Sequence, residues 1–108
     1  MQYLDIEQIS NYFAICEIIA QDPFFTNLGD LLQILAISDK PRAVHDPDLK
    51  PAVFTLINTL MTQLDFLVFA GSEDAGKPLK TLHEVTSYLD SNWNTAANRS
   101  NLLIFKRR

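Results

Sequence analysis

Apolar residues recur at steps of three and four along most of the chain, which is the spacing of one face of an α-helix. This periodicity predicts four helices, over residues 6–21, 28–37, 49–70 and 79–92. The chain also has only three glycines, and the links between its periodic segments are short. These features are typical of helical bundles. We therefore predict an all-α protein, a compact antiparallel bundle of four helices with a possible fifth short element at the C-terminal end.

Polar, proline and glycine residues mark the expected ends of these helices. Asp5 and Gln8 have the spacing of a capping pair for the first helix, and the second helix is expected to open at residue 26 or 27. Asp48 is the expected N-cap of the third helix, and Gly71 its C-terminal stop. Pro78 suits the first turn of the fourth helix, because the missing N–H would have no partner there.

The C-terminal segment, Asn94–Arg108, cannot be assigned from its pattern. Asn92–Asn101 is polar, so we expect a break there, and Leu102–Phe105 is too short to classify. It fits a last helical turn, a strand or an inserted tail. The three basic residues at 106–108 could touch an acidic surface, but such ends usually only solubilise the chain.

The predicted third helix is apolar nearly all round, which indicates a helix that is central to its bundle or shared with a partner. Leu60 and Leu64 lie on its principal face and are expected in the core. Four large side chains lie off that face, and four helices in a small chain do not obviously cover them. We therefore predict a homodimer that buries these residues: Phe54, Leu56, Phe66 and Phe69.

Composition fits one folded unit, a single domain over residues 1–108. The chain is 47% hydrophobic, which is enough to form a core without disulfides or a metal. Its one cysteine, Cys16, is expected to be a small buried hydrophobe. The start of the chain lacks the basic segment of a secretory signal, and no apolar run is long enough to cross a membrane. We expect a cytoplasmic protein that does not act at a membrane.

Charge is distributed unevenly along the chain. The formal net charge is −4 and the pI is near 4.9, which argues against nucleic acid as the main ligand. Residues 1–38 carry five acidic residues and no lysine or arginine. We predict that this segment binds a protein, possibly a basic one, because complementary charge speeds encounter between partners. An ordinary solvated face is the alternative. The expected partner-binding residues are Glu7, Glu17, Asp22 and Asp30.

One phosphate-binding motif is suggested by spacing and excluded by chemistry. Residues 71–77 match GxxxxGK, but Pro78 stands where the motif needs a Ser or Thr hydroxyl and a backbone N–H. Glu73 and Asp74 would also repel phosphate groups. We predict no nucleotide binding and interpret this segment as a turn.

No catalytic or metal-binding constellation is apparent. His45 lies close to Asp46 and Asp48, and His83 precedes Glu84, but neither group has the i, i+4 spacing that places ligands on one helical face. The serines match neither a GxSxG nor an SxxK motif. We therefore predict no catalytic residues, no cofactor and no metal.

These absences favour a non-catalytic function. We expect a small acidic helical protein that binds a macromolecular partner, of the inhibitor, immunity, adaptor or chaperone type. One alternative is a structural subunit of a homodimer or larger assembly, and another is a small-molecule or metal enzyme. An aromatic group near the C-terminal end could anchor a partner, although core filling is the more frequent role: Tyr88, Trp93 and Phe105.

Overall fold

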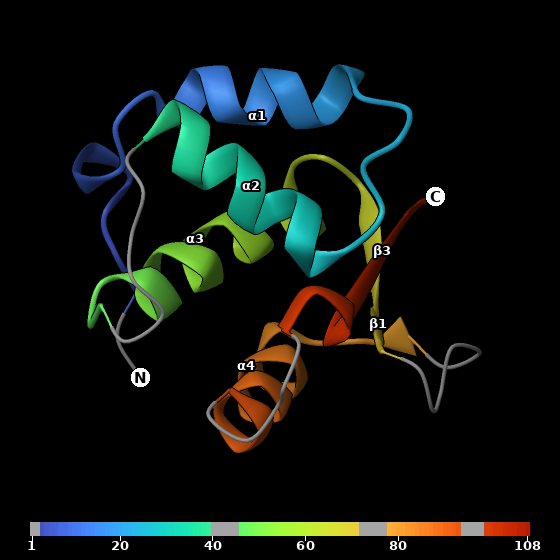
Figure 1. The fold of residues 1–108 in the computed structure, drawn as a ribbon. Helices are drawn as coiled ribbons and strands as arrows, with labels where there is room; N and C mark the ends of the chain where they lie inside the picture. Colours follow the sequence, from blue (N-terminus) through green and yellow to red (C-terminus); the bar gives the residue numbers. More distant parts are fainter. Residues whose placement is uncertain (1–2, 40–45, 72–77, 94–98) are drawn as a thin grey trace.

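The described part of the chain combines four α-helices with a three-stranded antiparallel sheet, so the prediction of an all-α bundle is wrong (Figure 1). The computed structural model describes residues 3–39, 46–71, 78–93 and 99–108. The helices are α1 (Tyr12–Gln21), α2 (Leu28–Ser38), α3 (Leu49–Thr62) and α4 (Leu82–Asn92). The strands are β1 (Phe66–Ala70), β2 (Pro78–Leu79) and β3 (Leu103–Arg107), in the order β2-β1-β3. Two short 3-10 helices complete the described elements, η1 (Ile6–Gln8) and η2 (Arg99–Asn101).

The predicted helix over residues 49–70 is two elements, α3 and β1. The chain leaves α3 through a tight turn, in which the Leu64 N–H donates to the Thr59 carbonyl at 3.1 Å. Asp65 follows with a φ of 60°, in the left-handed region, and reverses the chain. A short continuous apolar run fits a buried strand as well as a buried helix, and periodicity alone cannot separate them. Here the aromatic and branched residues of β1 form the central strand.

Pro78 belongs to β2 and not to the first turn of the fourth helix. It pairs with Phe69 at the edge of the sheet, where a residue without an N–H is tolerated. The fourth helix begins after Thr81, whose hydroxyl accepts the Glu84 N–H at 3.1 Å. The prediction for residues 79–92 is therefore right over α4 and wrong at its start.

The C-terminal residues form β3, which settles the open assignment of residues 102–105. β3 runs antiparallel to β1, from the pair Ala70 and Leu103 to the pair Phe66 and Arg107. Gly71 serves this pairing and does not end a helix. Its N–H donates to the Leu102 carbonyl at 2.7 Å, and a Cβ atom there would lie 1.6 Å from the Asn101 carbonyl oxygen.

The first predicted helix, residues 6–21, is interrupted between η1 and α1. Asn11 takes a left-handed conformation with a φ of 59°, and its amide donates to the Ser38 carbonyl. The Ser10 N–H donates to the Asp39 carboxylate at 3.0 Å, so the break is attached to the end of α2. The second predicted helix is confirmed as α2, with Asn27 as its N-cap.

The core surrounds α3, which lies at the centre of Figure 1 between the α1–α2 pair and α4. Leu60 is fully buried, as predicted, whereas Leu64 lies after the helix and is half-buried. The four side chains expected to need a second copy are buried within one chain: Phe54, Leu56, Phe66 and Phe69. These four side chains therefore give no reason to expect a second copy, because the elements of one chain already cover them.

Candidate functional site

The outward side of α1 is unusually apolar. The helix buries Tyr12, Ile15 and Ile19 against the core. Its opposite side, here named the α1 outer face, consists of Phe13, Ala14, Glu17, Ile18, Ala20 and Gln21, all of them exposed. The Phe13 side chain is 78% exposed and Ile18 is 44% exposed. Phe24, just beyond the helix, is 82% exposed. Large exposed apolar side chains gathered on one short segment make it a candidate interaction site.

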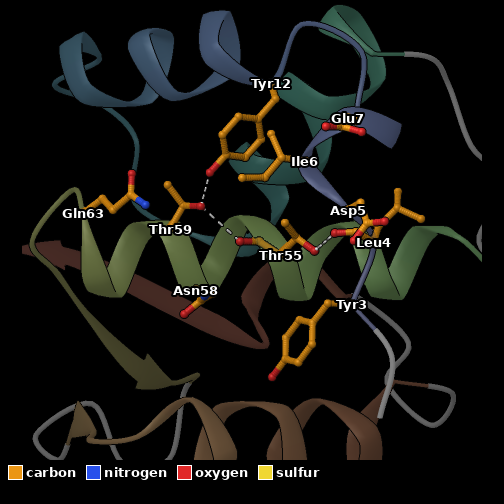
Figure 2. A pocket seen from close by; sticks show the side chains of 10 residues that line it. All are labelled: Tyr3, Leu4, Asp5, Ile6, Glu7, Tyr12, Thr55, Asn58, Thr59 and Gln63. Atoms are coloured by element: carbon orange, nitrogen blue, oxygen red, sulfur yellow. Dashed lines mark hydrogen bonds between the residues drawn. The ribbon is translucent and has the colours of Figure 1, made fainter.

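A cavity of about 460 Å³ lies between the N-terminal segment and α3 and reaches α1 at Tyr12; we call it the α3 cavity. Figure 2 shows Thr55 and Thr59 at its centre, with Tyr12 and Ile6 on one side. Tyr3 and Asn58 lie on the other side. The remaining lining residues are Leu4, Asp5, Glu7 and Gln63.

Hydrogen bonds through the floor of the α3 cavity attach the N-terminal segment to α3 (Figure 2). The Thr55 hydroxyl donates to the Leu4 carbonyl at 2.6 Å, and the Thr59 hydroxyl donates to the Thr55 carbonyl at 3.2 Å. The Tyr12 hydroxyl is hydrogen-bonded to the Thr59 hydroxyl. Burial raises the pKa of Tyr12, so its phenol keeps its proton. The floor is therefore polar and uncharged at neutral pH.

The rim of the α3 cavity has polar groups that have no partner in the described part of the chain. Within the described ranges, no hydrogen bond or ion pair engages the side-chain polar groups of Tyr3, Glu7, Asn58 or Gln63. The Tyr3 ring is held in an edge-to-face contact with Phe54, at a centroid distance of 6.1 Å. These groups are available to a ligand.

A second cavity of about 410 Å³ adjoins the first, between η1 and the start of α1. Ile6, Glu7 and Tyr12 line both cavities, and Phe13 lines the second. Neither lining contains Lys, Arg or His among the residues that the structure describes. Together the two cavities connect α3 to the α1 outer face through one acidic and apolar surface.

The structure separates the four predicted partner-binding residues into two pairs. The Asp30 carboxylate accepts the N–H groups of Thr26 and Asn27 at the start of α2. The Asp22 carboxylate accepts the Phe24 N–H at 2.8 Å. Both therefore hold local backbone structure. Glu7 and Glu17 are exposed, and only these two lie on the surface described above.

The acidic end of the sequence is not free of basic groups in space. The Arg107 guanidinium donates to the carbonyls of Ile19 and Asp22, at 2.8 and 2.6 Å, at the C-terminal end of α1. It also lies 4.9 Å from the centre of the Phe66 ring. The last residue, Arg108, pairs with Asp65 at 3.0 Å. These bases belong to β3 and its end, where they join the strand to the rest of the fold.

The other sequence candidates do not form a site. Trp93 and Phe105 are buried and Tyr88 is half-buried, so the aromatic group fills the core. Burial raises the pKa of the Cys16 thiol, which makes it a poor nucleophile. His45 and residues 72–77 lie outside the described residues. Among the described residues, no group of three or more His, Cys, Asp or Glu side chains could hold a metal.

The α3 cavity is not among the features predicted from the sequence, although α3 carries a signal for it. Thr55, Asn58, Thr59 and the C-cap residue Gln63 lie on one side of a helix that is mostly apolar. This arrangement forms a polar stripe. Its meaning depends on the N-terminal segment that lies over it, and no local pattern predicts that contact.

Comparisons of the chain with family models, with curated proteins and with solved structures found no match. No helix in the described ranges is long and apolar enough to span a membrane.

Proposed function

We propose that this protein binds another protein, a basic one, through the α1 outer face and the adjoining η1. One observation carries the proposal: the α1 outer face exposes Phe13 and Ile18 beside Glu17, with Glu7 at its edge. Exposed apolar side chains beside charged ones are a common composition of protein interfaces. Exposed aromatic residues on such surfaces commonly contribute much of the binding energy.

The charge of this surface supports a basic protein over other ligands. Helices that lie on membranes carry Lys and Arg on their polar side, and α1 has neither. Nucleic acid would be repelled by Glu7 and Glu17. A basic protein satisfies both carboxylates while its apolar residues cover Phe13, and the opposite charges speed encounter.

A different protein is favoured over a second copy. In a two-fold symmetric dimer the same patch meets itself. Pairing two copies through this surface would bring Glu7 and Glu17 of both chains together, and no lysine or arginine lies on the α1 outer face to compensate. The function class we propose is therefore a non-catalytic binder of the inhibitor, immunity, adaptor or chaperone type.

Site-specific photo-crosslinking tests this proposal. The photoreactive residue p-benzoylphenylalanine replaces Phe13 on α1, or His83 on the exposed side of α4 as the control. Each protein is irradiated in an extract of the cells that encode it. We expect one adduct with a basic protein from position 13 and none from position 83, because only the first lies on the proposed interface.

Competition then decides whether the adduct reports specific binding. Excess protein without the photoreactive residue should suppress the adduct. The double variant Glu7→Lys, Glu17→Lys should need a concentration at least about tenfold higher for the same suppression, since like charges oppose association. The same adduct from positions 13 and 83, or equal competition by the double variant, would contradict the proposal. A cross-link between two copies of this chain would favour the structural-subunit alternative.

A further inference from the structure

The α3 cavity has an uneven distribution of polar groups along its length. Thr55, Asn58, Thr59 and Gln63 form its base along α3, and the acidic residues Asp5 and Glu7 both lie toward one end, with Glu7 on the Tyr12 side (Figure 2). The opposite end, at Gln63, has a carboxamide. A ligand with a positive group should therefore bind with that group at the end that contains Asp5 and Glu7.

The aromatic and hydroxyl groups of the cavity further define the occupant. The Tyr3 ring is 44% exposed and is fixed by its edge contact with Phe54, so it offers a preorganised aromatic wall. The Tyr12 and Thr59 hydroxyls bond each other, which leaves the floor neutral. A group that combines positive charge, several N–H donors and a flat surface matches this combination.

We propose that the α3 cavity receives an arginine side chain of the partner protein, with its guanidinium at Asp5, between Glu7 on the Tyr12 side and the Tyr3 ring on the Asn58 side. This inference rests on the proposed function and names the chemistry of the partner. Arginine fits better than lysine, because the planar guanidinium stacks on an aromatic ring and bonds carboxylates through a fork of donors. A lysine ammonium is a point charge without a flat face.

The length of the polar stripe sets how much of the partner it holds. From Thr55 to Gln63 the helix rises about 12 Å, at 1.5 Å a residue. An extended chain covers that distance in about four residues. The free carboxamides of Asn58 and Gln63 then bond the backbone of the residues that flank the arginine. The occupant is a short extended segment with one arginine at the carboxylate end.

A peptide titration of the whole ¹⁵N-labelled protein tests this inference without the partner. The probe is the blocked tripeptide Ac-Ala-Arg-Ala-NH2. Its control replaces arginine with citrulline, which has nearly the same shape and no charge. We expect saturable shifts of the side-chain amide signals of Asn58 and Gln63, and at least about tenfold weaker binding of the citrulline peptide, since a charge-assisted bond is lost.

Matched variants test whether a carboxylate of the cavity, and not one elsewhere on the surface, binds the positively charged peptide. Glu7→Gln should weaken the arginine peptide about tenfold, and Glu17→Gln, on the α1 outer face, should leave its affinity unchanged. Tyr3→Leu should remove most of the preference for arginine over a lysine peptide, because the flat wall is lost. Amide spectra of each variant in the absence of peptide report whether the fold is retained.

The results separate this inference from the proposed function. Equal binding of arginine and citrulline peptides, or shifts spread over α1 and α4 instead of Asn58 and Gln63, would overturn the arginine cavity. A specific adduct at position 13 would still support protein binding in that case. Conversely, peptide binding in the cavity without a competable adduct would retain the arginine site and reject the α1 outer face as the main interface.

Discussion

Helices α1 and α4 have nearly the same length, 10 and 11 residues, and each packs one side on the core. Their outward sides differ completely. α4 exposes His83, Glu84, Ser87, Asp90 and Ser91, all of them polar. α1 exposes Phe13, Ala14, Ile18 and Ala20, and only two polar residues, Glu17 and Gln21, lie among them.

The difference shows that the outward side of α4 is suited to contact with water, whereas the outward side of α1 is not. A helix of a single folded domain normally places polar residues toward water, as α4 does. The outward apolar residues of α1 are exposed and contribute little to the core of this chain. Their exposure is unfavourable unless another surface covers them, and this contrast with α4 is the basis of the binding role that we propose for α1.

The largest expected change in stability tests whether α1 and α4 pack equally well on the core. Ile15 on α1 and Leu89 on α4 are both fully buried. We expect Ile15→Ala and Leu89→Ala each to lower the free energy of unfolding by about 2 to 5 kcal/mol, since both remove buried methyl groups and leave a cavity. Chemical denaturation followed by circular dichroism measures the loss. A change below about 1 kcal/mol for Ile15→Ala alone would mean that α1 is only loosely packed, and its exposed residues would then need no partner.

A smaller effect is expected where β3 holds the end of α1. The Arg107 guanidinium bonds the carbonyls of Ile19 and Asp22 at the C-terminal end of α1, where helix carbonyls lack partners within the helix. Arg107→Met should cost about 1 to 2 kcal/mol, because charge-assisted bonds are lost from a partly exposed site. Arg108→Met is the control: its ion pair with Asp65 is exposed and should contribute less than about 0.5 kcal/mol. Equal losses from the two variants, measured by denaturation, would show that Arg107 does not specifically hold α1.

The sequence predicts elements well where their signals are local. α2 has a capping residue, Asn27, a regular apolar face and a defined end, and its prediction is confirmed. The residues of β1 continue the apolar run of α3 without a glycine or proline between them, so the same pattern fits a longer helix. Their assignment depends on pairing with β3, more than thirty residues later, and on the left-handed turn at Asp65. Periodicity contains no information on such contacts.

The residues of the candidate site also divide into those that the sequence predicts and those that it does not. Glu7 and Glu17 are found from charge alone, because uneven charge is visible in the sequence. The same reasoning includes Asp22 and Asp30, since it cannot tell an exposed carboxylate from one that accepts backbone N–H groups. Phe13 is not predicted as a binding residue, because an apolar residue on a helix is expected to be buried when the sequence does not show which side of the helix faces the core.

The smallest expected change in stability comes from exchanging the outward character of the two helices. Phe13→Ser removes an apolar group from α1, and Ser87→Phe places one on the exposed side of α4. Both positions are exposed, so each variant should change the free energy of unfolding by no more than about 0.5 kcal/mol. Retention on a hydrophobic-interaction column should nevertheless fall for Phe13→Ser and rise for Ser87→Phe.

The same pair of variants separates general stickiness from a shaped interface. If α1 binds its partner through Phe13 together with Glu7 and Glu17, Phe13→Ser should abolish binding, and Ser87→Phe should neither strengthen nor replace it. Adding Ser87→Phe to Phe13→Ser would restore the apolar area of the protein but not its place beside the acidic residues. Recovery of binding in that double variant would mean that any exposed aromatic ring suffices, and the contrast between α1 and α4 would lose its functional meaning. Continued loss would locate recognition in the arrangement of Phe13 and the two carboxylates around η1.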